Sequence, residues 1–435
     1  MINPRYIAVE ALKRIKFEGA YANLISNDLT SRHKLSPLDA SLVTDLINGT
    51  TRYLRYLDFT LEKVSNRSLK EIEPDLLIVL EISAYSHLIR NIAPHAVVNE
   101  GVELARRIVG ERAVGFVNGI LRKYVQNDKQ YWETIINREK DETEALGIKY
   151  SFPDWIISHF STQFSDRKKL ESFLECLNRP PEVTFLRPPN LHSVLSDLKP
   201  GNLSPFAFKR QNRISVGQSV LTSKLIVQDE GSQLVALASL LTPVEGKDIN
   251  WLDLTAGPGG KSVFLASWAS SRKVKLSANE LHPHRAKLIT ESALRLKLDI
   301  NTTVGDSLTQ EWEQEFDRVL VDAPCSGLGA LRRRSEARWR KQEIDLVQLV
   351  DLQKKLLTRA INLTRSGGIV AYTTCSLHPR ETVEVVEFAA KVTKIEIIDA
   401  TQMLPWVPME RGPFLRLWPH IHDTDGMFLA LLKVG

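Results

Sequence analysis

Two of the three cysteines in this chain occupy positions that suit thiol chemistry. Cys325 stands in the run DAPCSGLG, and Cys375 follows 50 residues later in YTTCSL. Each closes a hydrophobic segment that predicts a buried strand, and strand ends commonly present catalytic groups. The chain contains no CxxC pair and too few cysteines for a disulfide framework, which favours free, reduced thiols. The pattern predicts nucleophilic chemistry, whereas the plainer alternative is that both are small buried hydrophobic residues.

The composition is that of an ordinary globular protein. The chain has 435 residues, 43% hydrophobic and 25% charged, so we expect two or three domains. The N-terminal run MINPRYIAVEALKRIKFEGA contains acidic residues and lacks the continuous apolar core of a signal peptide. No stretch approaches the roughly 18 uncharged apolar residues of a membrane span. We therefore expect a cytoplasmic protein that does not cross a membrane.

Local patterns predict three domains. Residues 1–140 show helical periodicity, with a start marked by Ser36-Pro37, and predict an all-α domain. Residues 141–225 mix helical runs with short strands between prolines and glycines, and predict a small α+β connecting subdomain. In residues 226–435 strands alternate with helices, which is typical of an α/β, doubly wound, mostly parallel sheet. We expect seven strands, in the segments INWLDL, KVKLSANE, INTTVGD, DRVLVDAP, GGIVAYTTCS, KIEIIDA and GMFLALLKV.

A glycine-rich turn follows the first of these strands, in the run DLTAGPGGK. Gly257, Gly259 and Gly260 leave room for backbone N–H groups to approach a ligand closely. The sequence GGKS also ends a phosphate-binding P-loop, but that loop requires a glycine where this chain has Thr255. We therefore disfavour a P-loop.

Acidic residues end the next three predicted strands, namely Glu280, Asp306 and Asp322. An acid after the second strand suits a ribose diol, as in dinucleotide-binding folds. The absence of GxGxxG, with a proline inside the turn, argues for a different nucleoside ligand. S-adenosylmethionine fits best, so we expect it as the cofactor. The alternative for each acid alone is a solvated strand end or a helix cap.

A basic segment begins six residues after Ser326. It reads RRRSEARWRK over residues 332–341, with six basic side chains against one glutamate. Charge runs are usually solvated faces, but Trp339 interleaves with the arginines next to a candidate active site, which favours phosphate binding. The whole chain carries a formal net charge of +5 at pH 7, a weak sign of a polyanionic partner. The predicted phosphate-binding residues are Arg332, Arg333, Arg334, Arg338 and Arg340.

The runs DLTAGPGGK, DAPCSGLG and YTTCSL together resemble the RNA 5-methylcytosine methyltransferase family. The resemblance extends through VQDEGSQL to the closing DGMFLALLK, and therefore covers essentially the whole chain. The N-terminal runs LDASLVTDLINGTTR, IAPHAVVNEGVELARR and VGFVNGILRKY are similar to the NusB-type helical RNA-binding domain. Two departures are Thr255, where the family usually has cysteine, and Glu280, where aspartate is commoner. Neither removes a carboxylate or a needed glycine.

The resemblance implies a Rossmann-like, S-adenosylmethionine-dependent methyltransferase domain that modifies carbon 5 of one cytosine in small-subunit (16S) ribosomal RNA. It implies that Cys375 is the nucleophile and that Cys325 assists product release. It also implies that Asp322 binds the exocyclic amine and N3, and that Lys261 contacts the base. The cofactor-binding residues that it implies, together with the strand-end acids, are Leu254, Thr255, Ala256, Gly257, Pro258, Gly259, Gly260, Glu280, Asp306 and Asp322.

This chemistry requires a covalent step. Carbon 5 of cytosine is a poor nucleophile, whereas a thiolate added to carbon 6 turns the ring into an enamine that can attack a methyl donor. A second group must then help to remove the carbon 5 proton and release the first thiol. The residues alone do not decide which cysteine attacks, and DNA cytosine methyltransferases use the Pro-Cys position. A free cysteine has a pKa of about 8.5, so we expect a cationic surrounding, to which the arginine segment contributes.

A cytosine stacked in a helix cannot present carbon 6 to a thiol, so the target must be single stranded or flipped out. We therefore expect accessory RNA contacts from the helical domain, the arginine segment and the connecting subdomain. Lys209, Arg210 and Arg213 are the candidates in the connecting subdomain, with an ordinary basic surface as the alternative.

Other classes of function are weaker. A non-catalytic RNA-binding ribosome assembly factor is disfavoured because both cysteines and the glycine turn are intact. The same chemistry on tRNA or DNA is disfavoured by the NusB-like domain, by analogy only. The pairs His282 with His284 and His420 with His422 lack further ligands at metal spacing, so we expect no metal. We expect a monomer whose partner is small-subunit ribosomal RNA.

Overall fold

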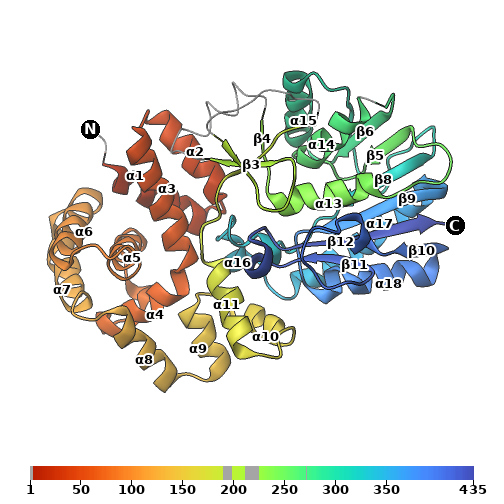
Figure 1. Cartoon of the computed structure of the whole chain (residues 1–435). Helices are drawn as coiled ribbons and strands as arrows, with labels where there is room; N and C mark the ends of the chain where they lie inside the picture. Colours follow the sequence, from red (N-terminus) through yellow and green to blue (C-terminus); the bar gives the residue numbers. More distant parts are fainter. Residues whose placement is uncertain (1–2, 190–197, 211–224, 271) are drawn as a thin grey trace. The chain divides into compact units, whose positions relative to one another are not determined.

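The computed structural model describes residues 3–189, 198–210, 225–270 and 272–435. The chain divides into two compact units, which Figure 1 colours by sequence. The helical unit comprises Met1–Asn178 and Arg333–Arg340, and the sheet unit comprises Arg179–Arg332 and Lys341–Gly435. The sheet unit is therefore interrupted in sequence by a short stretch that folds with the N-terminal helices.

The helical unit packs around α5, which contacts α1, α3, α4, α6 and α7. Ile78, Val79 and Leu80 in the middle of α5 are completely buried. The predicted start of α3 is confirmed, because the Ser36 hydroxyl accepts a hydrogen bond from Asp39 N and Pro37 occupies the first turn. The helices are α1 (Pro4–Phe17), α2 (Ala22–Arg32), α3 (Pro37–Arg52), α4 (Leu54–Ser65), α5 (Pro74–Leu88), α6 (Pro94–Ile108), α7 (Val114–Tyr124), α8 (Lys129–Glu139), α9 (Glu142–Lys149), α10 (Asp154–Ser161), α11 (Arg167–Leu177) and α16 (Ala337–Arg340).

The helical unit extends beyond the boundary predicted at residue 140. Helices α9, α10 and α11, expected in the connecting subdomain, fold with the N-terminal helices. Arg55 of α4 shows why, since its Nη1 donates to Phe152 O and to Asp154 Oδ1, each at 2.6 Å. Contacts between residues nearly 100 positions apart are not visible in local periodicity.

A small sheet opens the sheet unit. Its strands are β1 (Thr184–Leu186), β2 (Leu198–Pro200), β3 (Ala207–Arg210) and β4 (Ile226–Val227), in the order β2-β3-β1-β4 with antiparallel pairing. The predicted strand in RPPEVTFLRPPN contains β1. The one in FKRQNRISV begins in β3 and continues into residues 211–224, which lie outside the described residues.

The main sheet has the order β10-β12-β9-β8-β5-β6-β7, with β11 added beside β12. The pairs among β5 to β9 are parallel, and β10, β11 and β12 pair antiparallel, which confirms the mostly parallel sheet. Within the described residues it has eight strands rather than seven, because the run FLRL between prolines forms β11 and was not predicted. The strands are β5 (Asn250–Asp253), β6 (Lys275–Glu280), β7 (Asn301–Val304), β8 (Phe316–Asp322), β9 (Thr364–Thr374), β10 (Ile395–Ile398), β11 (Phe414–Leu417) and β12 (Met427–Val434).

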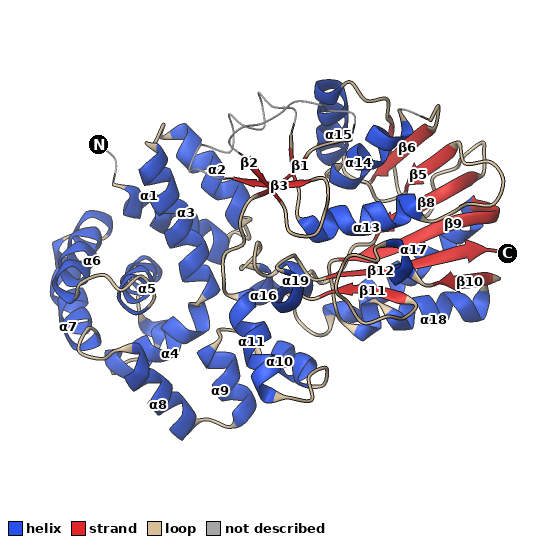
Figure 2. Cartoon of the chain, in the orientation of Figure 1, coloured by secondary structure: helices blue, strands red, loops and turns tan. Residues whose placement is uncertain are grey.

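Helices cover both faces of this sheet (Figure 2). On one face, Leu320 of β8 packs in the cluster that holds α13 (Glu230–Leu241) and α14 (Gly260–Ala269), next to α15 (Pro283–Leu296). On the other face, Val319 and Val321 pack against α17 (Asp345–Leu363) and α18 (Val383–Val392). Alternate residues of one strand point to opposite faces, so a strand covered on both sides is apolar throughout. This arrangement leaves the strand ends free to carry polar groups.

Candidate active site at the carboxyl ends of the strands

The two cysteines meet at the carboxyl ends of neighbouring strands. β8 and β9 pair in parallel with Asp322 opposite Thr373, so the loops that follow them begin side by side. The Sγ atoms of Cys325 and Cys375 lie 3.4 Å apart, within hydrogen-bond distance for sulfur. A disulfide bond is about 2.05 Å long, so the two sulfurs are in contact but not bonded to each other.

Cys325 holds its proton firmly. The hydrogen bond with Cys375 is the main cause that raises the pKa of the Cys325 thiol well above its ordinary value, and burial adds to it. The charges of Cys375 and of Glu381 act in the same direction. Where two such groups share a site, the proton stays on one of them. The raised pKa therefore favours Cys325 as the protonated member of the pair.

An ion pair lies beside the thiols. Lys261, in the first turn of α14, places its Nζ 2.7 Å from Asp322 Oδ2 at the end of β8. The Lys261 side chain is 9% exposed and that of Asp322 is 32% exposed, so the carboxylate is the more accessible partner. Burial has the largest single effect and lowers the pKa of Lys261. The charge and hydrogen bond of Asp322, together with the charges of Cys375 and Asp253, outweigh it and raise the pKa overall. The structure thus brings the predicted base-binding residues together with the cysteine pair.

The glycine turn joins β5 to α14 at the same edge of the sheet. Gly259 has φ +107°, a conformation that favours glycine, and it precedes the first residue of α14. A Cβ atom on Gly257 would lie 2.0 Å from Glu280 Oε2, so a side chain there would force the Glu280 carboxylate to move. The Thr255 hydroxyl donates to Asp322 O at 3.0 Å, which ties the turn to the end of β8.

Glu280, at the end of β6, and Asp306, just beyond β7, differ in their surroundings. Glu280 is 4% exposed, accepts a hydrogen bond from His282 N at 2.9 Å, and lies 3.5 Å from Arg285 Nη1. It therefore lies directly against the glycine turn. Asp306 is exposed and accepts from Leu308 N at 2.9 Å, within its own loop. Only Glu280 is held against the turn by these contacts.

Two further polar residues support the turn, and the sequence reasoning missed both. Asn279 is completely buried, and its Nδ2 donates to Gly305 O and to the Ser307 hydroxyl. Ser307 in turn donates to Leu254 O at 2.6 Å. These bonds link the loop after β7 to the glycine turn. The available sequence signal was Asn279 itself, a polar residue inside an apolar strand and one position before Glu280.

Asp253, the last residue of β5, was also missed. It is completely buried, its Oδ2 accepts from the Ser262 hydroxyl at 2.6 Å, and its Oδ1 has no hydrogen-bond partner among the described residues. Burial raises the pKa of Asp253 to about 7, although the bond from Ser262 opposes this. The side chain thus supports the turn from below, and the raised pKa keeps its proton up to near neutral pH.

Comparisons with known proteins agree with this geometry. A family model described as 16S rRNA methyltransferase RsmB/F matches residues 238–433, and the NusB family model matches residues 2–126. A Mycobacterium tuberculosis (strain CDC 1551 / Oshkosh) protein named "Putative methyltransferase MT1451" is 37% identical over 99% of this chain and 96% of its own length. The "Probable ribosomal RNA small subunit methyltransferase B" of Bacillus subtilis (strain 168) is 30% identical over 99% of this chain and 98% of its own. This chain belongs to the RsmB/F methyltransferase family.

The fold agrees with that membership. A solved structure named "Crystal Structure of PH0851" matches with a TM-score of 0.80 at 22% identity, covering 100% of this chain and 99% of that chain. The prediction of a Rossmann-like methyltransferase domain preceded by a NusB-like helical domain is confirmed. As a member of the RsmB/F family, the protein is a methyltransferase.

The arginine segment of this RsmB/F family member differs from the prediction. Arg338 is completely buried in the helical unit, with its guanidinium 4.0 Å from the centre of the Phe152 ring. Its Nη1 donates to Arg52 O, Ser151 O and Asn178 Oδ1 at 2.9–3.2 Å. Burial lowers the pKa of Arg338, as expected for a guanidinium without a carboxylate partner in these bonds. The prediction that Arg338 binds RNA is wrong.

Arg332 is also turned inward, within the sheet unit. It is 4% exposed, and its Nη2 donates to Asp423 Oδ1 at 2.7 Å. The prediction that it binds phosphate is therefore wrong as well. Arg334 is exposed and Arg333 is half-buried, so an RNA contact by either stays a prediction.

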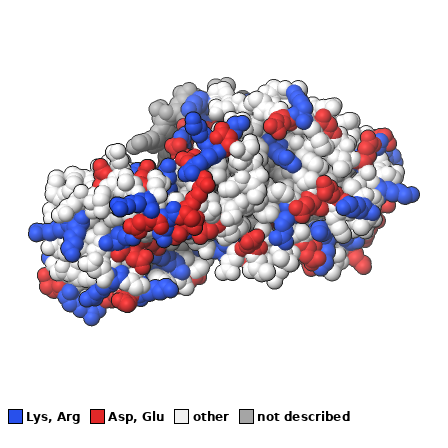
Figure 3. Space-filling view, turned by 90° about the horizontal axis from the view of Figure 1, so that it is seen from below, with Lys and Arg blue, Asp and Glu red and all other residues white. Residues whose placement is uncertain are grey.

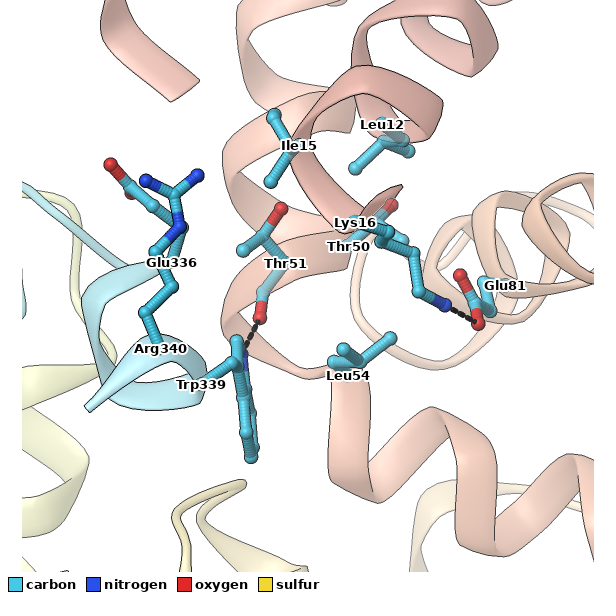
Figure 4. Close-up of a pocket in the computed structure, with 10 residues that line it drawn as sticks. All are labelled: Leu12, Ile15, Lys16, Thr50, Thr51, Leu54, Glu81, Glu336, Trp339 and Arg340. Carbon is cyan, nitrogen blue, oxygen red and sulfur yellow. Dashed lines mark hydrogen bonds and ion pairs between the residues drawn. The ribbon is translucent and has the colours of Figure 1, made fainter. Parts of the chain in front are cut away.

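The end of the segment lines a pocket of about 180 Å³ in the helical unit. Figure 4 shows Trp339 and Arg340 on α16 facing helices α1 and α3. Trp339 Nε1 donates to Thr51 O at 2.7 Å, and the Arg340 guanidinium lies 4.8 Å from the centre of the Tyr21 ring. Arg340 is half-buried and also donates to Ala20 O. These bonds hold α16 in place, and an RNA contact by Arg340 stays a prediction.

The connecting subdomain offers less basic surface than the sequence predicted. Lys209 is 4% exposed and lies 3.5 Å from Glu230 Oε1 and 3.6 Å from Asp423 Oδ2, so it is paired with carboxylates. The side chain of Arg210, and Arg213 altogether, lie outside the described residues. On the face in Figure 3, lysines and arginines are interspersed with acidic side chains.

The described residues contain no group of three or more His, Cys, Asp or Glu side chains placed to hold a metal ion. No helix in the described part of the chain is both long enough and apolar enough to span a membrane.

Proposed function

We propose that this RsmB/F family member methylates carbon 5 of a cytosine in small-subunit ribosomal RNA through a covalent cysteine adduct. The contact of 3.4 Å between the sulfurs of Cys325 and Cys375 carries the proposal. Two thiols this close reach the same ring, so one can form the adduct while the other assists its breakdown. The Bacillus subtilis relative is named for small-subunit ribosomal RNA, and the NusB match supports an RNA partner.

The glycine turn fits S-adenosylmethionine as the methyl donor. The turn between β5 and α14 is exposed at Pro258 and half-buried at Gly260, and Glu280 supplies a carboxylate at the end of the adjacent strand. The residues from Leu254 to Gly260 would hold the cofactor, with Glu280 on its ribose and Asp306 and Asp322 at the neighbouring strand ends. When bound, S-adenosylmethionine supplies an electrophilic methyl group.

Cys375 is the proposed nucleophile. Its thiolate forms a bond to carbon 6 of the cytosine. The electron pair of the double bond between carbons 5 and 6 shifts to carbon 5 and is shared with N3 and the ring carbonyl. Asp322 accepts a hydrogen bond from the exocyclic amine, and the Lys261 ammonium stabilises the negative charge that develops at N3 and the ring carbonyl. Because Lys261 and Asp322 are 2.7 Å apart, both reach one edge of the base.

Cys325 is the proposed base for release. The hydrogen bond and charge of Cys375 raise the pKa of Cys325, and both disappear when Cys375 becomes a neutral thioether. Cys325 then loses its proton to solvent more readily, at the stage where a base is needed. Its thiolate removes the proton on carbon 5, the double bond to carbon 6 re-forms, and Cys375 leaves as a thiolate. One proton is released in each turnover.

Cysteine variants test these roles. We expect Cys375→Ala to abolish both the adduct and methylation, because no nucleophile remains. We expect Cys325→Ala to form the adduct but release it slowly, so that a covalent protein–RNA complex accumulates on a denaturing gel. Trapping by Cys375→Ala instead would reverse the two roles.

The substrate requires a separate test. Bisulfite mapping of 5-methylcytosine in ribosomal RNA should show one small-subunit site that disappears when the protein is removed and returns with the native chain. The Cys375→Ala protein is the control, since it should bind RNA without restoring the mark. A map unchanged by removal of the protein contradicts the ribosomal RNA substrate.

A further inference from the structure

Glu381 is a completely buried carboxylate beneath the cysteine pair. It ends the short 3-10 helix Pro379–Glu381 that follows β9 and the Cys375 loop. Its Oε1 accepts hydrogen bonds from Ser326 N at 2.7 Å and from Gln353 Nε2 at 3.1 Å. Its Oε2 accepts from the hydroxyl of Ser376 at 2.6 Å and from that of Ser326. The catalytic scheme above assigns no role to this residue.

These bonds join the two cysteine loops. Ser326 directly follows Cys325 and Ser376 directly follows Cys375, and their hydroxyls are themselves 3.2 Å apart. A single carboxylate group therefore holds the residue next to each thiol. Fixing both neighbours restricts the backbone positions from which both sulfurs project.

A third element supports the same group. Gln353 of α17 is completely buried and donates through Nε2 both to Glu381 Oε1 and to Pro324 O, the latter at 2.8 Å. The hydroxyl of Tyr372, in β9, donates to Glu381 O at 2.8 Å. Glu381 is thus anchored by the strand before it and by a helix on one face of the sheet.

None of the four groups that donate to the Glu381 side chain is cationic. Burying a carboxylate without a cation is costly, so such a group is retained where its hydrogen bonds have a specific use. Four donors from two loops and one helix satisfy both oxygens. The charge also acts on the site, since it contributes to the raised pKa of Cys325.

We propose that Glu381 is a positioning residue that ties the Cys325 loop to the Cys375 loop and so holds both sulfurs in contact against a single base. The identity of that base rests on the proposed function, whereas the sulfur contact does not. A displacement of about 1 Å in a reacting group can cost on the order of a hundredfold in rate. Loss of the tie should therefore disturb both the sulfur contact and the chemistry.

The sulfur contact can be measured without RNA or cofactor. Diamide oxidises two adjacent thiols to a disulfide, taking up two electrons and two protons, and the rate depends on how closely the thiols approach. In a Cys176→Ala background, we expect the native pair to form a Cys325–Cys375 disulfide readily, identified by peptide mapping. We expect Glu381→Ala to slow this reaction by about tenfold or more. A native protein that forms no such disulfide overturns the inference.

Two further variants separate positioning from general damage. Glu381→Gln keeps an oxygen acceptor and the side-chain shape, and the serine hydroxyls can rotate to accept from its amide, so cross-linking should stay within a few-fold of native. Asp317→Ala is the matched control, because Asp317 is also a buried carboxylate that accepts from two backbone N–H groups, near the opposite end of β8. It should leave cross-linking unchanged. Cross-linking by Glu381→Ala that is no slower than by Asp317→Ala overturns the inference.

Methylation provides the second measurement. We expect Glu381→Ala to lower kcat for RNA methylation far more than it raises KM, and Glu381→Gln to restore most of the lost rate. Slowed cross-linking together with an absence of cytosine methylation by the native protein would retain the positioning role and remove the proposed function. If Glu381→Ala cross-links as fast as the native protein, and cytosine methylation by the native protein is observed, the positioning role is removed and the proposed function is retained.

Discussion

The fold opposes ionisation of the Asp253 side chain. Its pKa is raised to about 7 by burial, and no cation lies among its hydrogen-bond partners. In the unfolded chain the same carboxyl has a pKa near 3.9. Below about pH 4 it is protonated in both states and carries no penalty. Between about pH 4 and pH 7 the unfolded chain loses the proton first, so the contribution of Asp253 to stability falls as pH rises.

Asp253→Asn should remove this pH dependence. Asparagine is uncharged at every pH and can still accept from Ser262, so the difference in unfolding free energy between the variant and the native protein should grow in favour of the variant from pH 4 to pH 7. The upper limit is about 4 kcal/mol, from about three pKa units at 1.36 kcal/mol each. Urea unfolding of both proteins across this range measures it. A difference that is constant with pH would contradict the raised pKa.

The glycine turn shows how an element places these side chains. It bends the chain at the carboxyl end of β5 so that Lys261 enters the first turn of α14 and reaches Asp322. The space above Gly257 is occupied by the carboxylate of Glu280, which is itself bonded to His282 N. A side chain at Gly257 would therefore displace a proposed ribose ligand as well as the turn.

Gly257→Ala should weaken cofactor binding by about tenfold or more, which corresponds to ~1.4 kcal/mol. Titration calorimetry with S-adenosylmethionine measures the effect. Gly412→Ala is the control in the same unit, because nothing lies within 4 Å of the added Cβ there. Equal affinities for the two variants would show that the turn does not form the cofactor site.

At the scale of the whole molecule, the chain returns from the sheet unit to the helical unit through Arg333–Arg340. Arg338 is the anchor of this return, since it contacts Phe152 and three acceptors inside the helical unit. Its burial shows that part of a segment that looks like an RNA-binding run instead packs inside the helical unit. Arg334, in the same segment, remains exposed.

The two arginines should therefore respond differently to substitution. We expect Arg338→Ala to lower the unfolding free energy by about 1–3 kcal/mol, because it leaves buried carbonyl groups without a donor, and to leave the RNA affinity of the folded protein unchanged. We expect Arg334→Ala to keep the native melting temperature and to weaken RNA binding with a reduced salt dependence. Calorimetry and binding titrations at two salt concentrations distinguish them. Weaker RNA binding by folded Arg338→Ala would contradict the structural role.

The elements, and the order in which they present their polar groups, follow from local sequence patterns. Alternating apolar segments, the glycine turn and the polar residues after each strand are local patterns, so the predicted strands, the turn and the edge that carries both cysteines could be read residue by residue. The strand β11 was not predicted, because its four residues are too few to show a clear periodicity.

Which of these groups are in contact, and which charges are buried, depends on tertiary packing. The 3.4 Å contact between thiols 50 residues apart and the bonds from Glu381 to both loops depend on how strands pair. The bond from Arg338 to Arg52 O spans 286 residues. The sequence of an arginine run does not reveal whether the run is exposed or buried, because burial depends on packing between distant segments.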